Sequence, residues 1–383
     1  MKKIAVIFGT RPDTIKMAPI ILELQKDPKL FHVLSIATAQ HRHMLDQVLQ
    51  VFDIKPAYDL NIMRPKQTLA TLTKNIIVSL DEILVLEKPD MVLVQGDTTT
   101  TFVGSLAAFY RQIPVGHVEA GLRTNDKANP FPEEINRRLT SCIADLHFAP
   151  TATAKKALLK EHVNPASIFV TGNSVIDALK YSVQKKHTFR QKNLSRIAEG
   201  KNRIVLITMH RRENWGAPMR SAAQAVRRLA MRYPDAYFIF PVHLNPVVRE
   251  AVYPILEPVR NVLLIEPLDY LDFINLMARS YLIITDSGGV QEEGPALGKP
   301  ILVLRKVTER PEAVRFGTVK LVGLNEKRIV EEASRLMDDP KAYRVMSGAV
   351  NPYGDGRSAE RTVGIIKNYF GLSKRRIKEF IPR

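Results

Sequence analysis

Short apolar segments rich in β-branched residues alternate along the chain with longer segments of helical periodicity. This alternation is typical of βα units whose strands form parallel sheets. In the first half, the pattern predicts buried strands in KIAVIFG, DMVLVQGD, IPVGHVEAG and SIFVTG. In the second half, it predicts strands in RIVLITMH, AYFIFPVH, NVLLIEP, YLIITDSGG, KPILVLR and VKLVG. We therefore expect an α/β protein with two parallel sheets in tandem.

Helices are expected between the strands of the first half, over Thr14–Lys26, Gln67–Leu86, Thr101–Arg111 and Glu133–Leu146. In the last of these segments the apolar residues recur at steps of three and four and share one helix face. They are Ile135, Leu139, Cys142, Ile143 and Leu146. Their periodicity predicts that Cys142 is a small core residue.

Turn residues follow the strand SIFVTG, and we place the domain boundary at Thr171–Gly172. Ligands of such folds bind outside the carboxyl ends of the strands, so the site is expected in a cleft that both sheets face. The polar stretch Lys185–Lys201 is expected to be a linker or a surface insertion. The remaining assignments are a first domain over 1–171, a second over 172–357, a helix over 358–370 that packs back on the first domain, and a basic tail over 371–383.

The composition, with 383 residues of which 45% are hydrophobic and 25% charged, is that of a globular chain with a core in each domain. No apolar run approaches the roughly 18 residues of a membrane span. The first apolar run stops after Phe8, so a secretory signal is not expected. A single cysteine excludes a disulfide within the chain. We expect a cytoplasmic protein.

The formal net charge of +17 favours anionic partners and raises the hypothesis of nucleic-acid binding. The basic residues are spread along the chain, however, and only Ser373–Arg383 is a concentrated run. No nucleic-acid-binding module is recognisable, and aromatic residues are only 7%. The tail is therefore interpreted as a solvated, ragged end, and no specific nucleic acid is expected as a partner.

The segment GTRPDTIK directly follows the first strand. Gly9 permits a tight turn into a helix, and Pro12 suits the first helical turn. Arg11 and Lys16 would lie near a helix N-terminus, which itself favours phosphate. The dinucleotide fingerprint GxGxxG is absent here. A plain loop with surface cations is the alternative interpretation.

A second segment, TDSGGVQEE, follows the strand YLIIT. Ser287, Gly288 and Gly289 would bring backbone amides to a helix start, which suits a diphosphate. Glu293 lies about one helical turn beyond Gly289 and could accept bonds from ribose hydroxyls. The alternative for Glu293 is a solvated helix glutamate.

Several acids and a histidine lie at or near predicted strand ends, where α/β enzymes place reactive groups. They are Asp97, Glu119, Glu133 and His210, the last followed by Arg211. Neighbouring carboxylates can have their pKa values pushed apart, so that one donates and the other accepts a proton. Taken singly, Asp97 could be a helix cap, Glu133 a helix-dipole partner and His210 a core histidine. Their joint placement favours an acid–base site.

Fragments of metal sites occur at His41-Arg42-His43 and at His117 with Glu119. Neither makes a complete three-ligand set at a recognised spacing. No catalytic metal is expected.

Nine segments in order resemble the non-hydrolysing UDP-N-acetylglucosamine 2-epimerases of bacteria and archaea. They are GTRPDTIKMAP, AQHRHMLDQVL, LVQGDTTTT, PVGHVEAGLRT, PEEINRRLT, HRREN, TDSGGVQEEGPALGKP, ERPEAV and NPYGDG. The resemblance covers nearly the whole chain up to the basic tail.

This resemblance implies a GT-B-like fold with two Rossmann-like domains around a cleft, assembled as a homodimer. It also implies interconversion of UDP-N-acetylglucosamine (UDP-GlcNAc) and UDP-N-acetylmannosamine (UDP-ManNAc) with no cofactor, neither NAD nor metal. In that family UDP is eliminated across C1–C2, which leaves a 2-acetamidoglucal, and is then added back after proton delivery to the other face.

The family's site residues carry over to this chain by position. Arg11, Lys16 and His210 would bind the diphosphate or hold the sugar, and Asp97, Glu119 and Glu133 would act as, or position, the acid–base group at C2. The remaining contacts implied for the nucleotide are the amides of Ser287, Gly288 and Gly289 to the phosphates, Glu293 to the ribose, Arg310 in the cleft, Phe273 beside the uracil, and the backbone near Leu268.

A few positions depart from the family's usual pattern. Asp13 stands where glutamate is common, Gln95 where histidine is common, and Lys306 and Val307 where an Asp-Thr pair is frequent. Many bacterial members bind a second UDP-GlcNAc as an activator. At the positions used for that purpose, Gln40 matches, whereas His43 and Lys66 replace glutamine and arginine, so activation is left open.

Two other enzyme classes share the fold and the diphosphate-binding segment. A GT-B glycosyltransferase would release UDP only with an acceptor, and a hydrolysing relative would release UDP and free N-acetylmannosamine. The acids that match the epimerase pattern favour the 2-epimerase over the glycosyltransferase.

Overall fold

The chain divides into two compact units in the computed structural model. The first unit comprises Met1–Tyr181 with Tyr353–Ile381, and the second comprises Ser182–Pro352 with Pro382–Arg383. The structure describes residues 1–39, 42–64, 67–184, 186–308 and 310–383, without the side chains of 42–44. Each unit contains one parallel sheet, which confirms the predicted α/β class with two Rossmann-like domains.

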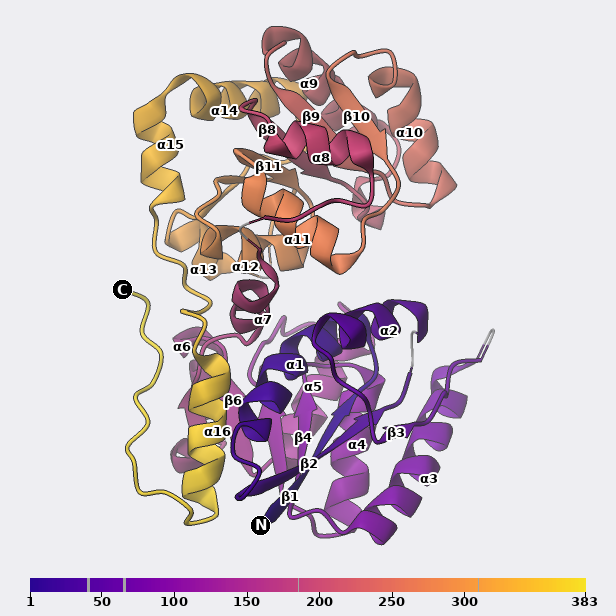
Figure 1. Ribbon diagram of the computed structural model, residues 1–383, viewed down its shortest axis with the longest axis vertical. Coiled ribbons are helices and arrows are strands. Elements are labelled where there is room, and N and C mark those ends of the chain that lie inside the picture. Colours follow the sequence, from indigo (N-terminus) through magenta and orange to yellow (C-terminus); the bar gives the residue numbers. More distant parts are fainter. Residues whose placement is uncertain (40–41, 65–66, 185, 309) are drawn as a thin grey trace. The chain divides into compact units, whose positions relative to one another are not determined.

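The sheet of the first unit has the strand order β3-β2-β1-β4-β5-β6-β7 (Figure 1). Its strands are β1 (Lys2–Phe8), β2 (Phe31–Ala37), β3 (Tyr58–Asp59), β4 (Met91–Gln95), β5 (Val115–Val118), β6 (Leu146–Ala149) and β7 (Ile168–Val170). Its helices are α1 (Arg11–Gln25), α2 (Arg42–Val51), α3 (Leu69–Glu87), α4 (Thr99–Tyr110), α5 (Glu133–Ile143), α6 (Ala152–Lys160), α7 (Val175–Ser182) and α16 (Ser358–Tyr369).

The sheet of the second unit has the order β10-β9-β8-β11-β12-β13. Its strands are β8 (Ile204–Thr208), β9 (Tyr237–Pro241), β10 (Val262–Ile265), β11 (Leu282–Thr285), β12 (Ile301–Val303) and β13 (Val319–Leu321). Its helices are α8 (Lys192–Glu199), α9 (Ala217–Arg232), α10 (Pro246–Leu256), α11 (Tyr270–Arg279), α12 (Gly288–Ala296), α13 (Pro311–Arg315), α14 (Glu326–Asp338) and α15 (Pro340–Ser347). None of the helices in the described part of the chain is long and apolar enough to cross a membrane.

Both sheets reverse their strand order beside the first strand of the unit. The reversal lies between β1 and β4 in the first unit and between β8 and β11 in the second. In sheets of this type the loops that leave such a pair of strands diverge to opposite faces and form the ligand site. The loops after these four strands therefore define where each unit can bind a ligand.

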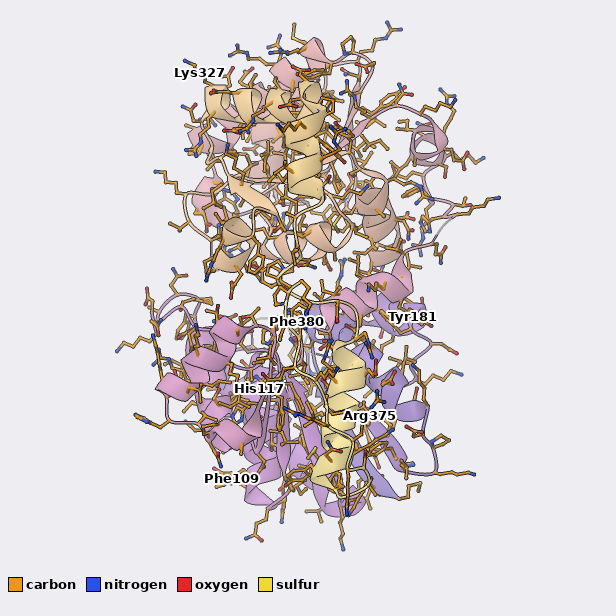
Figure 2. All side chains as sticks on the ribbon, turned by 90° about the vertical axis from the view of Figure 1, so that its left-hand side faces the viewer. Phe109, His117, Tyr181, Lys327, Arg375 and Phe380 are labelled. Atoms are coloured by element: carbon orange, nitrogen blue, oxygen red, sulfur yellow. The ribbon has the colours of Figure 1, made fainter. Side chains whose placement is uncertain are left out.

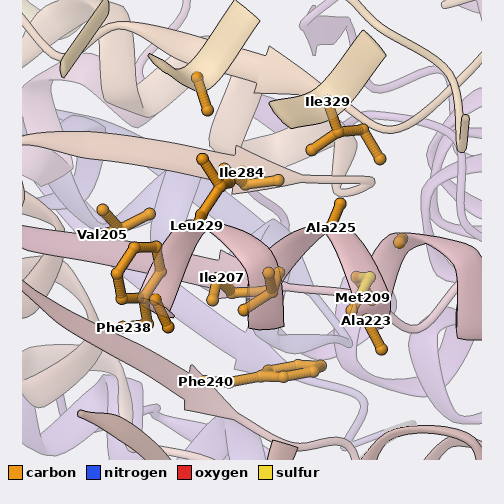
Figure 3. Packing of buried hydrophobic residues seen from close by; sticks show 14 of the residues in the cluster. Val205, Ile207, Met209, Ala223, Ala225, Leu229, Phe238, Phe240, Ile284 and Ile329 are labelled. Carbon is orange, nitrogen blue, oxygen red and sulfur yellow. The ribbon is translucent and has the colours of Figure 1, made fainter. Parts of the chain in front are cut away.

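Apolar side chains cover both faces of each sheet. In β1, Ala5 and Ile7 pack into a cluster with α3 and α4. The alternate residues Ile4, Val6 and Phe8 are also fully buried, and the two-residue period of a strand directs them to the opposite face. In the second unit, strands β8, β9 and β11 pack against α9 and α14 in the same way (Figure 3).

The prediction that Cys142 is a core residue is wrong, because the apolar face of α5 is exposed and its polar face is buried. Cys142 is exposed, and Ile135 and Leu139 are 38% and 41% exposed. The buried residues of this helix are instead polar: Glu134, Asn136, Arg137, Thr140 and Ser141. These polar groups are hydrogen-bonded inside the unit, so periodicity alone selected the wrong face.

Strands β2, β3 and β6 were not predicted. The sequence of β2, FHVLSIA, includes a histidine and a serine, yet it pairs with β1 along seven residues. The predicted helix over Glu133–Leu146 ends at Ile143, and Leu146 is the first residue of β6. The side chain of Asp145 accepts a hydrogen bond from the amide of Val115, which fixes this turn to the start of β5.

The first unit extends to Tyr181, ten residues beyond the predicted boundary at Thr171–Gly172. The reason is that α7 packs into the first unit and is bound to α16. The carboxylate of Asp177 accepts hydrogen bonds from the amides of Ser358 and Ala359, at the start of α16. This carboxylate caps the returning helix, which also contacts α1.

The stretch predicted as a linker or a surface insertion, of which Lys185 lies outside the described residues, folds onto the second unit. Phe189 and Leu194 are buried there, and the ring of His187 bonds to Asp272 of α11 at 2.6 Å. Because the stretch is mostly polar, its composition did not indicate that Phe189 and Leu194 would be buried.

The basic tail is not a ragged end, and its interpretation as one was wrong. It runs back along α16 (Figure 2, where Arg375 and Phe380 are labelled). The amide of Phe380 donates to the carbonyl of Val170, and the carboxylate of Glu379 accepts from the amide of Val170 and from Lys155. The ring of Phe380 is only 6% exposed, below the guanidinium of Arg361. The tail therefore covers the edge strand β7.

We predict that Phe380→Ala lowers the free energy of unfolding of the first unit by about 2–4 kcal/mol, because it removes a buried ring. Ile381→Ala is the matched control, since Ile381 is 63% exposed. Urea unfolding followed by circular dichroism measures both variants. Equal stability of the two variants would contradict an anchoring role for Phe380.

Candidate active site

The loops after β1, β4 and β5 bring the predicted groups of the first unit together. The helix α1 begins at Arg11, directly after the tight turn at Gly9, and contains Lys16 in its second turn. Asp97 follows β4, and Glu119 follows β5. The strands β1, β4 and β5 are neighbours in the sheet, so these residues share one edge of it.

Glu119 is a buried carboxylate with partners from several loops. It forms an ion pair with Lys16, and it accepts hydrogen bonds from the amide nitrogens of Gln95 at 2.5 Å and Asn173 at 2.9 Å. Its backbone has a φ of +64°, a left-handed conformation that is uncommon for a residue with a side chain. Such backbone strain is concentrated at functional sites.

Asp97 follows the neighbouring strand and is more open than Glu119, with 31% of its side chain exposed. Its carboxylate forms an ion pair with Arg137, and its backbone carbonyl accepts a bond from the side chain of Asn136 at 3.0 Å. A Cβ at the intervening Gly96 would lie 3.5 Å from Glu119 Oε2, so the loop of Asp97 passes directly over that carboxylate. The loops after the neighbouring strands β4 and β5 thus each contribute an acid that is paired with a cation.

Glu133 and Glu134 at the start of α5 have different environments. Burial would raise the pKa of Glu134, but hydrogen bonds from the amides of Thr124 and Asn125 and from Arg138 hold that pKa below its ordinary value. Glu134 is therefore a structural acid. Glu133 Oε2, by contrast, is buried and has no hydrogen-bond partner among the described residues. It lies one helical turn before Arg137, the partner of Asp97.

His117 supports the loop of Asp97 from below. Its Nε2 lies 2.8 Å from the carbonyl oxygen of Gly96, and burial lowers the pKa of the imidazole to about 3. The ring is therefore neutral. Within the described part of the chain, no three His, Cys, Asp or Glu side chains are close enough together to hold a metal ion.

Asp13 is buried directly beneath these groups. Its Oδ2 accepts bonds from the amides of Gly9 and Thr10 and from the hydroxyl of Thr98, at 3.2–3.4 Å. Burial raises the pKa of this carboxyl to about 7, and the nearby charge of Asp97 adds to the increase against the opposing effects of the hydrogen bonds and of Lys16. A carboxyl in this environment exchanges its proton near neutral pH.

His210 of the second unit is held by Asp286, at the two strands where the sheet order reverses. The Nδ1 of His210 lies 3.2 Å from Asp286, which also accepts bonds from the amides of His210 and Arg211 and from the side chain of Asn214. Burial would raise the pKa of Asp286, but the bond to His210 and that residue's charge, together with the two amides, hold it below its ordinary value. The imidazole itself is 40% exposed and open to a ligand.

The segment TDSGG forms the turn between β11 and α12, as the sequence predicts. The amide of Ser287 already donates to the hydroxyl of Thr285 at 2.9 Å. The amides of Gly288 and Gly289 lie in the first turn of α12, where no intrahelical acceptor exists. Arg310 lies against this turn, since a Cβ at Gly288 would be 2.6 Å from its guanidinium. Two amides and a cation therefore converge at this helix start, which suits an anion.

The other predicted nucleotide contacts lie in the same unit. Glu293 is buried in α12, and Phe273 and Leu268 are half-buried at the start of α11 and in the loop before it. Of the residues that depart from the family pattern, Lys306 and Val307 are exposed. Gln40, Lys66 and the side chain of His43 lie outside the described residues.

Sequence reasoning missed the partners that hold the predicted residues. The missed residues are Arg137, Asn136, Asn173 and Asp286. Asp13 was noted only as a departure from the family pattern, and its role in holding the two loops was missed. For Arg137 a signal existed, because it lies one helical turn after Glu133 and so shares its face. Asn173 and Asp286 also directly follow predicted strands, as the acids do.

Comparison with known proteins gives one consistent family. A family model described as UDP-N-acetylglucosamine 2-epimerase matches residues 22–367. The UDP-N-acetylglucosamine 2-epimerase of Bacillus subtilis is 54% identical over 382 residues, covering 99% of each chain. A crystal structure of the Neisseria meningitidis UDP-GlcNAc 2-epimerase bound to UDP-GlcNAc is 50% identical, with a TM-score of 0.85, over 96% of this chain and all of that one. The Methanocaldococcus jannaschii enzyme in complex with UDP-GlcNAc and UDP is 35% identical, with a TM-score of 0.78, over 96% and 99% of the two chains.

We predict that Asp13 makes the stability of the first unit pH-dependent. The folded protein holds the proton of Asp13 more tightly than the unfolded chain, whose pKa is near 3.8. Stability is therefore lost as the pH rises from about 4 through about 7, by at most about 4 kcal/mol at 1.4 kcal/mol per pKa unit. Urea unfolding at pH 5 and pH 8 should show Asp13→Asn gaining stability relative to wild type at the higher pH. A difference between the two proteins that is independent of pH would contradict this assignment.

Proposed function

The chain belongs to the UDP-N-acetylglucosamine 2-epimerase family, and from that premise we propose that it interconverts UDP-GlcNAc and UDP-ManNAc without hydrolysing either. The observation that carries the proposal is the pair of acids at the ends of β4 and β5. These strands are neighbours in the sheet, and Asp97 and Glu119 are each paired with a cation. A redox cofactor is not required for the chemistry described below.

The difficulty of the reaction is that the C2 hydrogen of the hexose is not next to a carbonyl group. A base therefore has to remove this proton while the C1–O bond breaks. The electron pair of the C2–H bond becomes the C1=C2 double bond of 2-acetamidoglucal, and UDP leaves with the electrons of the C1–O bond. Delivery of a proton to the other face of C2, with return of UDP to C1, completes the inversion. Such a step needs a positioned base and strong stabilisation of the departing diphosphate.

We assign the proton transfers to the first unit. Asp97, Glu119 and Glu133 form the acid–base group, and Arg11 and Lys16 stabilise the negative charge of the sugar diphosphate. The exposed fraction of the Asp97 side chain, 31% against 7% for Glu119, supports Asp97 as the acid that is open to the ring. The buried and unpartnered Oε2 of Glu133 supports its inclusion.

We assign the nucleotide to the second unit. The amides of Gly288 and Gly289, with Arg310 and His210, would bind the diphosphate, while Ser287 forms the turn. The exposed imidazole of His210, fixed through Asp286, supports this role. Glu293 would bind the ribose. Phe273, at the start of α11, and the backbone near Leu268, in the loop before this helix, would contact the uracil.

Incubation of the protein with UDP-GlcNAc in D₂O tests this proposal. We predict UDP-ManNAc as product, deuterium at C2 of both sugars, and no free N-acetylmannosamine. Asp97→Asn should slow this exchange by about 100-fold or more, the range of a lost acid–base group. Asp235→Asn, an exposed substitution in the second unit, should leave it unchanged. Nuclear magnetic resonance of the sugar protons measures all of these outcomes.

Two results would contradict the proposal. Unlabelled UDP-GlcNAc after long incubation would exclude proton removal at C2. Release of UDP with free N-acetylmannosamine would instead assign the chain to the hydrolysing kind of epimerase.

We further propose that the protein is a homodimer through the face formed by α3, α4 and α5. These helices contact one another in sequence, so the face is continuous. Large apolar side chains are exposed along it, namely Phe109, Tyr110, Phe131, Ile135 and Leu139. Two of them, Phe109 and Tyr110, line a groove of about 540 Å³ together with Ile113, Pro114, Val115 and Ile143 among others. Apolar patches of this kind mark protein–protein contacts.

Leu139→Asp tests the homodimer. Wild type should elute with twice the chain mass of 43.2 kDa, and the variant with the mass of one chain, because a carboxylate in an apolar contact is costly. Leu159→Asp, which alters a 37% exposed leucine on α6, is the matched control and should remain dimeric. Light scattering after size exclusion measures the masses. A wild type with the mass of one chain would contradict the proposal.

A further inference from the structure

Asp13 joins the two loops that contain the reactive groups of the first unit. Its Oδ2 accepts bonds from the amides of Gly9 and Thr10 on the loop after β1. The same oxygen accepts a bond from the hydroxyl of Thr98 on the loop after β4. Arg11 directly follows the first loop, and Asp97 directly precedes Thr98. The carboxyl group of Asp13 thus connects the loop that leads to Arg11 with the loop that contains Asp97.

The two loops are also packed without space between them. A Cβ at Gly9 would lie 2.4 Å from the hydroxyls of both Thr38 and Thr100, and these hydroxyls bond to each other at 2.9 Å. A shift of the loop after β1 therefore has to move the first turn of α4. The junction is closely packed, and Asp13, which bonds to both loops, is only 4% exposed.

Thr98 transmits the position of Asp13 to Asp97. Its side chain caps α4 by accepting a bond from the amide of Thr101, while its hydroxyl proton is donated to Asp13. On its other side, Asp97 is held by Arg137 and Asn136 of α5. The carboxylate of Asp97 is thus fixed between α5 and the junction of Asp13.

We propose that Asp13 is a positioning residue of the epimerisation reaction, which sets the location of Asp97 relative to Arg11 and Lys16. This inference rests on the proposed function. Asp13 lies beneath the loops and touches no reacting atom. Asp13 is the third residue of α1 and completes a capping box with Thr10, a position that a neutral glutamine can also fill, whereas here a carboxyl is buried beside the charge of Asp97. Displacement of a reactive group by about 1 Å can cost about 100-fold in rate, so the junction at Asp13 should have a direct effect on turnover.

The test compares Asp13→Ala, Thr98→Val and the double variant with wild type. We expect each single variant to lower kcat at least about tenfold. The double variant should be no slower than the slower single variant, because both substitutions break the same junction. The Kd of UDP, measured by calorimetry, should stay within about threefold, because the contacts assigned to the uracil and the ribose, and the glycine amides assigned to the diphosphate, lie in the second unit. Asp13→Glu, which keeps the carboxyl group, should recover kcat to within about threefold of wild type.

Matched controls separate this role from a loss of stability. Asp90 joins the opposite ends of the same two strands, since its carboxylate accepts a bond from the amide of Lys3, next to β4. Thr68 caps α3 through the amide of Thr71, as Thr98 caps α4. Asp90→Asn and Thr68→Val should therefore lower the melting temperature without changing kcat. If Asp13→Ala does not fold, Thr98→Val measured against Thr68→Val carries the test.

The outcomes distinguish the two proposals. A wild type without exchange at C2 would contradict the proposed function. An active wild type, together with Asp13→Ala or Thr98→Val at unchanged kcat, would contradict the role of Asp13 alone. Multiplicative effects in the double variant would also contradict it, since they would mean that the two residues act independently.

Discussion

The carboxylate of Glu119 is buried inside the protein, and the architecture of the first unit follows from the need to pair it. A buried charge is costly unless it is paired and hydrogen-bonded. Here the partners come from three other places in the sheet: Lys16 after β1, Gln95 at the end of β4, and Asn173 after β7. The acid can be satisfied only when these strand ends are assembled in the correct order.

The second unit uses a buried acid for a different purpose. Asp286 accepts its hydrogen bonds from the loop that follows β8 and thereby fixes His210, whose ring stays accessible. Glu119, which follows β5, and Asp286, which follows β11, therefore illustrate two uses of a buried acid at the carboxyl end of a strand. One acid is a member of the proposed reacting group, and the other orients a neighbour that would bind the anion.

The sequence was sufficient for the class of fold and for most of the strands, because apolar β-branched runs and turn residues are local signals. It was insufficient where burial depends on distant partners. Cys142 lies on the apolar stripe of α5, yet that stripe is exposed and Arg137 is buried, because Arg137 has Asp97 as a partner from another element. The prediction for the tail was wrong for the same reason, since Phe380 is held by a hydrogen bond to β7, which is distant in the sequence. For the site, sequence motifs predicted which residues can carry the chemistry. The partners that hold these residues could be identified only from the folded structure, where the strand ends lie together.

The central claim is that the acids at the ends of β4 and β5 act on C2 of the hexose. A crystal structure of the protein with UDP and 2-acetamidoglucal, the two products of elimination, tests it most directly. We expect a carboxylate oxygen of Asp97 or Glu119 within about 3.5 Å of C2, the distance of a reactive contact. A complex in which Asp97, Glu119 and Glu133 all lie remote from the ring would contradict it.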